Sequence, residues 1–227
     1  ALFSAHAVFK KVQAEQALVE IDIRLAEFEA VFLGIVQEWG ESIDAKDPYT
    51  QGHCTRVAEY ALALAESVGI DPKVMIWFQM GALLHDVGKV LVPDEILNKP
   101  GDLDEEERHI INRHPEAGET LLKGVEFPWD ILPMVRHHHE RWDGKGYPDG
   151  LSGEDIPLPA RIVCVVDVFD ALTTSRAYRA AMTLDKALEL IERESGGAFD
   201  PHLQALFTEL VESGVIASHL RETAALV

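Results

Sequence analysis

The sequence predicts an all-α protein. Apolar residues recur at spacings of three and four along most of the 227 residues, the period of helices that bury one face. Asp-Pro pairs, typical of helix starts, recur at Asp47, Asp71 and Asp200. The chain has neither a hairpin signal nor an alternation of strand and helix patterns. We therefore expect about nine helices and no internal repeat.

Bulk composition narrows the possible functions. Hydrophobic residues make up 47% of the chain, so a sizeable core is expected, and the net charge of -19 argues against a broad DNA-binding surface. No apolar run approaches the ~18 residues of a membrane span. The two cysteines, Cys54 and Cys164, form no disulfide framework, which favours a reducing cytoplasm. Because the chain begins with Ala1, we expect either a piece of a longer protein, with a partner domain upstream, or a processed protein.

Residues 1–40 are predicted to form one long helix, followed by a second domain over residues 41–227. The apolar seam of the long helix alternates spacings of three and four, as in a coiled coil, through Leu18, Ile21, Leu25, Phe28, Phe32, Ile35 and Trp39. Two interpretations stay open. The helix packs on its own domain, or it joins two protomers and carries a signal from an upstream sensor.

Two helices are expected next, each opened by an Asp-Pro pair. The first runs from Asp47 to about Val68, with His53 on its inward face. The second, after Asp71, is apolar nearly all round and is expected to be the central helix, delivering His85 and Asp86 at an end that Gly88 supplies.

The remaining helices follow from caps and breaks. A loop is expected over residues 93–101, and Asp104 with Glu107 forms a capping-box pattern for the helix after it. A glycine-rich loop is expected over residues 143–150. The β-branched residues of 157–175 also suit a strand, but the inward pair Asp167 and Asp170 favours a helix. Helices are thus predicted over residues 104–113, 114–124, 128–141, 157–175, 184–194 and 201–212.

Histidines and aspartates at helix ends and inward faces predict a metal centre. Each alone is more often a hydrogen-bonded core residue or a surface group than a ligand. Together they exceed what one ion takes and suit two, with a carboxylate of Asp86 or Asp167 between ions about 3.5–4 Å apart, as in phosphoester hydrolysis. The candidates are His53, His85, Asp86, His114, His137, His138, His139 and Asp167.

Two long motifs resemble those of a known family. His85-Asp86-Val87-Gly88-Lys89 is similar to the signature of the HD superfamily of metal-dependent phosphohydrolases, and residues 138–148, from the second histidine of the triplet through Gly146-Tyr147-Pro148, resemble the motif of its HD-GYP branch. The stretches around His53 and Asp167 also fit. The resemblance covers about residues 47–207 and implies a single helical HD-type domain.

The resemblance implies a bacterial phosphodiesterase that hydrolyses cyclic di-GMP to the linear dinucleotide pGpG, to GMP, or to both, through a hydroxide between two ions. It implies seven metal ligands: His53, His85, Asp86, His114, His138, His139 and Asp167. His137 is expected to point elsewhere. Some family members have a glutamate where this chain has Tyr49, a poor ligand, so we expect two ions rather than three. Iron or manganese is expected, with zinc, nickel or cobalt as alternatives.

Several residues are expected to act on the substrate. Asp86 is expected to bridge the ions and Lys89 to contact a phosphate oxygen, and both are therefore catalytic candidates. By resemblance, Arg176 and Arg179 would bind guanine or the second phosphate. Tyr147 either stacks on a base or pins its loop, and that loop either lines the pocket or binds a protein partner.

Two other functions are compatible with the pattern. One is an HD-superfamily enzyme acting on another nucleotide or phosphoester, against which the Gly-Tyr-Pro motif argues. The other is a non-catalytic receptor or scaffold for a cyclic dinucleotide, against which the complete set of seven ligands argues. The expected partners are cyclic di-GMP, an upstream sensor or receiver domain, and a second copy bound through the N-terminal helix.

Overall fold

The computed structural model describes residues 2–46, 51–175 and 180–216, and the chain divides into two compact units, residues 1–36 and 37–227. Helix α1, Leu2–Asp44, provides all described residues of the first unit and the first residues of the second. The predicted positions Tyr49, Arg176 and Arg179 lie outside the described residues. No described helix is both long enough and apolar enough to cross a membrane.

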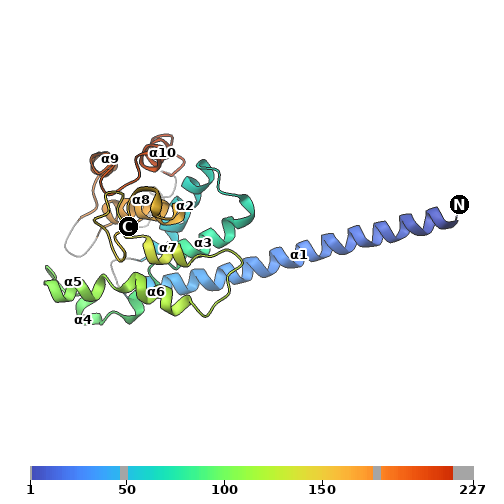
Figure 1. Ribbon diagram of the computed structural model, residues 1–227, viewed down its shortest axis with the longest axis horizontal. Coiled ribbons are helices and arrows are strands. Elements are labelled where there is room, and N and C mark those ends of the chain that lie inside the picture. The colour runs from blue at the N-terminus through green and yellow to red at the C-terminus, as the bar shows by residue number, and fades with distance from the viewer. Residues whose placement is uncertain (1, 47–50, 176–179, 217–227) are drawn as a thin grey trace. The chain divides into compact units, whose positions relative to one another are not determined.

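The second unit is all-α over its described residues, which confirms the predicted fold class (Figure 1). Three short 3₁₀ segments, residues 72–74, 87–91 and 153–155, connect its helices. The α-helices after α1 are α2 His53–Ser67, α3 Met75–Leu83, α4 Asp94–Leu97, α5 Glu105–Ile111, α6 His114–Leu122, α7 Leu132–His137, α8 Leu158–Thr173, α9 Leu184–Arg193 and α10 Pro201–Glu212.

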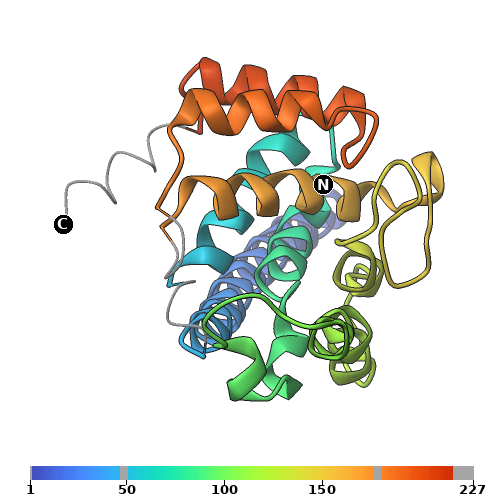
Figure 2. The ribbon, with the colours of Figure 1, turned by 90° about the vertical axis from the view of Figure 1, so that its left-hand side faces the viewer.

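Helix α8, rather than α3, lies at the centre of this unit. It packs against α2, α7, α9 and α10, and α9 and α10 run side by side along one flank (Figure 2). Its β-branched residues Ile162, Val163, Val165 and Val166 are fully buried. The helix prediction for this stretch is therefore confirmed, because burial on nearly all sides suits a helix as well as a strand. The prediction that α3 is central was wrong, since its packing partners are α2, α7 and the turn before it.

The local start signals act as predicted. Asp104 and Glu107 form both hydrogen bonds of a capping box, with 2.9 Å from each backbone nitrogen to the opposing carboxylate. Asp200 accepts hydrogen bonds from the backbone nitrogens of His202 and Leu203 at the start of α10. These side chains bond backbone groups that the first helical turn leaves unpaired, and so fix where each helix begins.

The structure corrects three boundaries. Helix α3 ends at Leu83, before the His85-Asp86 pair, and Gly88 lies inside the 3₁₀ segment rather than ending a helix. A Cβ on Gly88 would lie 1.9 Å from the carbonyl oxygen of His114, so the glycine allows that segment to pack on α6. The loop expected over residues 93–101 contains the single turn α4, and α7 is shorter than the predicted 128–141.

The last residue of α1 and the turn after it hold two segments of the second unit in place. Asp44 is buried and accepts hydrogen bonds from the backbone nitrogen and the thiol of Cys54, at 3.0 and 3.2 Å. The Lys46 ammonium donates to the carbonyl oxygens of Val90 and Val92, at 3.0 and 2.6 Å. The chain next to His53 and the chain after Lys89 are therefore bonded to the same short stretch.

Candidate metal centre

The structure brings the predicted histidines and aspartates into one buried cluster. The cluster contains two groups of possible metal ligands. Within each group the ligand atoms all lie within 4.8 Å of one another, and Asp86 belongs to both groups. The first group adds His53 and His85, and the second adds His114, His138 and His139. The side chains come from the start of α2, the turn after α3, the start of α6 and the residues that end α7.

Asp86 lies between the two groups, with one oxygen toward each. Its Oδ1 is 3.1 Å from Nε2 of His114 and 3.8 Å from Nε2 of His138. Its Oδ2 is 3.5 Å from Nε2 of His85 and 3.9 Å from Nε2 of His53, and it also pairs with the ammonium of Lys89. Asp167 from α8 extends the first group, because its Oδ1 is 3.3 Å from Nε2 of His53. The two oxygens of Asp86 thus have the arrangement that a carboxylate shared by two ions needs.

The Nδ1 atoms of four histidines are held by other groups. In His85, His114 and His138, Nδ1 donates to the carbonyl oxygen three residues earlier, at 2.7, 2.8 and 2.8 Å. In His53, Nδ1 donates to Oδ2 of Asp170 at 2.7 Å. A hydrogen bond at Nδ1 fixes the neutral tautomer whose Nε2 carries a free lone pair. In all four rings, Nε2 is the atom that faces the cluster.

Asp170 supports the cluster through its contact with His53, whereas sequence reasoning recognised it only as facing inward. It is buried, and besides His53 it accepts hydrogen bonds from Nε and Nη2 of Arg56, at 2.6 and 3.0 Å. Burial acts to raise the pKa of this carboxyl, but the bonds from His53 and Arg56 outweigh it and lower the pKa. The Asp170 carboxylate therefore favours its charged form and orients the His53 ring. Its three-residue spacing from Asp167 placed it on the same helix face, but only the fold shows what it contacts.

The environment of the cluster disfavours protonation of three imidazole rings and favours a cation beside the fourth, His53. Burial lowers the pKa of His85 to about 4 and also lowers that of His114 and His139. Burial acts in the same direction on His53, but hydrogen bonds with Asp167 and Asp170 outweigh it and raise the pKa of His53 to about 10. The space between His53 Nε2 and its carboxylates thus attracts a cation. A metal ion there would take the place of the proton.

The other predicted residues take different places. Lys89 is bonded to Asp86, and this carboxylate raises the pKa of the ammonium against the effect of burial. Tyr147 packs its ring on that of His139, with centroids 4.9 Å apart. His137 points away from the cluster, with Nε2 3.0 Å from Oδ2 of Asp149.

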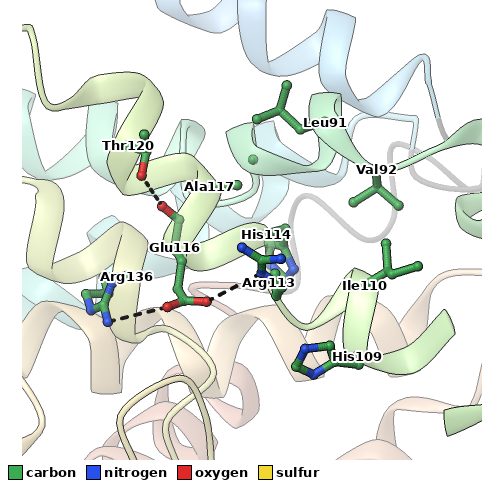
Figure 3. Close-up of a pocket in the computed structure, with 11 residues that line it drawn as sticks. Leu91, Val92, His109, Ile110, Arg113, His114, Glu116, Ala117, Thr120 and Arg136 are labelled. Carbon is green, nitrogen blue, oxygen red and sulfur yellow. Dashed lines mark hydrogen bonds and ion pairs between the residues drawn. The ribbon is translucent and has the colours of Figure 1, made fainter. Parts of the chain in front are cut away.

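A pocket of about 550 Å³ adjoins the cluster (Figure 3). Gly88 and His114 line it on the side of the cluster, and Leu91, Val92, Ile110 and Ala117 supply apolar surface. Polar side chains at its rim are His109, Arg113, Glu116, Thr120 and Arg136. Arg136 is engaged by Glu119 and Asp149, whereas Arg113 lies 4.0 Å from Glu116 and keeps 70% of its side chain exposed. Sequence reasoning did not single out these polar lining residues.

The fold and the cluster together define a class of protein. Residues 40–203 match the HD domain family, and the chain belongs to that family. Over 167 residues it is 44% identical to the 3'3'-cGAMP-specific phosphodiesterase 3 of Vibrio cholerae, covering 74% of this chain and 36% of the relative. It is also 44% identical over 162 residues to RpfG, a cyclic di-GMP phosphodiesterase response regulator of Xanthomonas campestris pv. campestris, covering 70% of this chain and 43% of the relative. The chain thus spans less than half the length of either relative.

A solved structure shows the same fold. The crystal structure of a Vibrio cholerae cyclic GMP-AMP phosphodiesterase, V-cGAP3, aligns with a TM-score of 0.66 and 20% identity over 83% of this chain and half of that one. At this identity the likeness concerns the fold alone. The predicted membership of the HD superfamily is confirmed by the family match, and the relatives found by sequence are phosphodiesterases of cyclic dinucleotides.

The residues present suit divalent ions. Five imidazoles and two carboxylates form a donor set typical of iron, manganese or zinc. Nε2 of His85 and Oδ1 of Asp86 are buried and have no hydrogen-bond partner within the described part of the chain. Leaving such atoms unpaired is costly unless another ligand satisfies them. Together with the family match, the cluster indicates a centre for divalent metal.

Proposed function

We propose that this chain is a metal-dependent phosphodiesterase that hydrolyses cyclic di-GMP. The observation that carries the proposal is Asp86, whose two oxygens face two separate groups of histidines. Two ions held in this way match the requirement of phosphodiester hydrolysis. The relatives of known substrate class, including RpfG, support a cyclic dinucleotide as the substrate.

The proposed ligands divide between the two ions. His53, His85 and Asp167 would hold one ion, His114, His138 and His139 the other, and Asp86 would bind both. Such ions supply polarisation of the phosphoryl oxygens and a lowered pKa of the attacking water. We assign iron or manganese because imidazole-rich sites with carboxylates suit them, with zinc, nickel or cobalt as alternatives. The absence of a carboxylate at Tyr49 supports two ions rather than three.

Positive side chains of this chain would bind the anionic substrate. Lys89, which pairs with the shared carboxylate, would contact a phosphate oxygen, and Arg113, which lines the adjoining pocket, would add a second positive charge. We assign Arg176 and Arg179 to guanine or the second phosphate on the family resemblance. These cations would make the local potential positive, whereas the net charge of -19 would otherwise repel a dianionic substrate.

The mixed cyclic dinucleotide 3'3'-cGAMP is a second candidate substrate. One relative specific for it and one that acts on cyclic di-GMP are both 44% identical to this chain. Overall similarity therefore does not favour either, and the identity of the second base becomes the experimental question.

The test combines metal content with turnover. The protein is purified without oxygen, its metals are quantified, and cyclic di-GMP, 3'3'-cGAMP and a linear phosphodiester are offered under equal conditions. We expect about two ions per chain and the highest kcat/KM for cyclic di-GMP, with product analysis separating pGpG from GMP. Faster cleavage of the linear diester, or tight binding of the cyclic dinucleotide without turnover, would contradict the proposal.

We also infer a second copy of the chain as a partner through α1. In residues 1–36 the predicted seam is largely exposed: Leu18, Ile21, Leu25 and Phe28 keep 53–64% of their surface accessible. A parallel coiled coil would cover it and connect the domain to an upstream sensor. The molar mass in solution, measured by light scattering, tests this, and a monomer at micromolar concentration would contradict it. The glycine-rich loop is the proposed contact for another protein partner.

A further inference from the structure

The glycine-rich loop, residues 143–150, is fixed by a buried carboxylate. Glu140 is 1% exposed, and its Oε1 accepts hydrogen bonds from the backbone nitrogens of Asp149 and Gly150, at 2.7 and 3.0 Å. Its Oε2 is buried without a hydrogen-bond partner among the described residues. Burying a carboxylate costs free energy, and the two hydrogen bonds that hold the end of the loop offset part of this cost.

A second clamp ties the same end of the loop to two helices. The Asp149 carboxylate accepts two hydrogen bonds of 2.8 Å from Arg136 and lies 3.0 Å from Nε2 of His137, both on α7. Arg136 also donates to Glu119 of α6 at 2.7 Å. The loop is therefore bonded to the helices that lead to His138 and begin with His114.

The loop turns back onto the residue before Glu140. A Cβ on Gly146 would lie 2.4 Å from the Arg141 nitrogen and 2.6 Å from the His139 carbonyl oxygen, so only glycine fits. The backbone nitrogen of Tyr147 donates to the carbonyl oxygen of His139 at 3.2 Å. This return places the Tyr147 ring against the His139 ring, with centroids 4.9 Å apart and planes inclined by 32°.

His139 differs from the other four histidines of the cluster. Their Nδ1 atoms are held by a carbonyl or by Asp170, whereas no hydrogen bond to the His139 ring is found within the described chain. Its contacts are with other rings: His138 at 4.1 Å, His114 at 4.9 Å and Tyr147. Tyr147 is the one of these three that is not itself a proposed ligand.

We propose that Tyr147 is a positioning residue for the metal ligand His139, and that Glu140 acts through Tyr147 by fixing the loop. This inference rests on the proposed two-ion centre and deepens it, because it assigns the Gly-Tyr-Pro segment to the metal rather than to a base of the substrate. Ring packing here does the work that a hydrogen bond does for the other ligands.

The test is the affinity of the full chain for Mn²⁺, measured by calorimetry on protein stripped of metal. In Tyr147→Leu we expect one of two Mn²⁺ affinities to fall about 10–100-fold, the range for loss of a ligand's supporting group. Tyr147→Phe keeps the ring and should stay within about threefold of the wild type. Glu140→Ala should repeat the loss, whereas Glu140→Gln, which keeps the acceptor oxygen, should not.

A matched control separates positioning from general destabilisation. Tyr60 is a buried tyrosine whose ring packs on that of Phe169, at 5.8 Å between centroids, and it is not among the residues of the cluster. Tyr60→Leu should lower the melting temperature and leave both Mn²⁺ affinities unchanged. Equal Mn²⁺ binding by the wild type and Tyr147→Leu, or an equal loss in Tyr60→Leu, would overturn this inference alone. A wild type that binds no Mn²⁺ would overturn the proposed function as well.

Discussion

Replacing Asp170 with asparagine tests whether this carboxylate sets the metal affinity through His53. The substitution keeps the shape but removes the charge that His53 and Arg56 share. Removing one partner of a buried ion pair costs about 3–5 kcal/mol. Asparagine still offers one acceptor oxygen, so we expect about 2–4 kcal/mol. For a chain of this size that lowers the melting temperature by roughly 5–15 °C.

Asp170→Asn should also lower the affinity for Mn²⁺, for a reason separate from its effect on stability. An amide nitrogen facing Nδ1 of His53 would donate to it and place the ring proton on Nε2, the atom that faces Asp86 and Asp167. We expect the affinity for one Mn²⁺ to fall about 10–100-fold, measured by calorimetry well below the melting temperature of both proteins.

Asp200→Asn is the control for this measurement. Asp200 is buried like Asp170, and it accepts a hydrogen bond from Arg161 at 2.6 Å, but it caps α10 and is not among the residues of the cluster. Its replacement should lower the melting temperature without changing Mn²⁺ binding. If Asp170→Asn bound Mn²⁺ within twofold of the wild type, or if Asp200→Asn lost affinity equally, the reasoning about His53 would be refuted.

Three further experiments, two substitutions and one labelling reaction, test other parts of the structure. Asp86→Ala should abolish retention of both ions together with turnover, and full metal content in that variant, measured by mass spectrometry, would contradict its shared position. Arg113→Ala should raise KM for cyclic di-GMP about 3–10-fold at nearly constant kcat, the loss of one hydrogen bond from an exposed side chain, whereas Arg108→Ala, which lies outside the pocket lining, should leave KM unchanged. Cys54 and Cys164 should not react with a thiol reagent until the protein is unfolded, because burial raises the pKa of both, that of Cys164 to about 12. Rapid labelling of either thiol in the folded protein would contradict this.

Helices with explicit start signals could be predicted from sequence to within a residue or two. The capping box at Asp104 and the Asp-Pro pair at Asp200 are local devices, complete within four residues, so no tertiary information is needed to recognise them. The predicted start of α7 at residue 128 was wrong. Pro133 lacks the N–H that a helix begun there would need, and Asp130 accepts from the Leu132 nitrogen at 3.1 Å to start the helix later.

The partners of the predicted site residues could not be predicted, because they come from segments distant in sequence. Asp170 reaches His53 across 117 positions and Arg56 across 114. The motif placed Tyr147 near the cluster but left open whether its ring meets a base or a ligand. Packing shows one contact of this ring, since the return at Gly146 brings it onto the ring of His139. Its contact with a base stays a prediction.

One local rule accounts for three of the five histidines. His85, His114 and His138 each follow the end of a helix, where the last carbonyl oxygens have no partner within the helix. Each ring takes the carbonyl three residues earlier, Ala82, Ile111 or Val135, and thereby satisfies the helix end and fixes its own tautomer. The ring of His139, the residue after His138, forms no such hydrogen bond within the described part of the chain. The proposed fifth histidine ligand therefore needs support from outside its helix, and we propose that the loop that returns with Tyr147 supplies it.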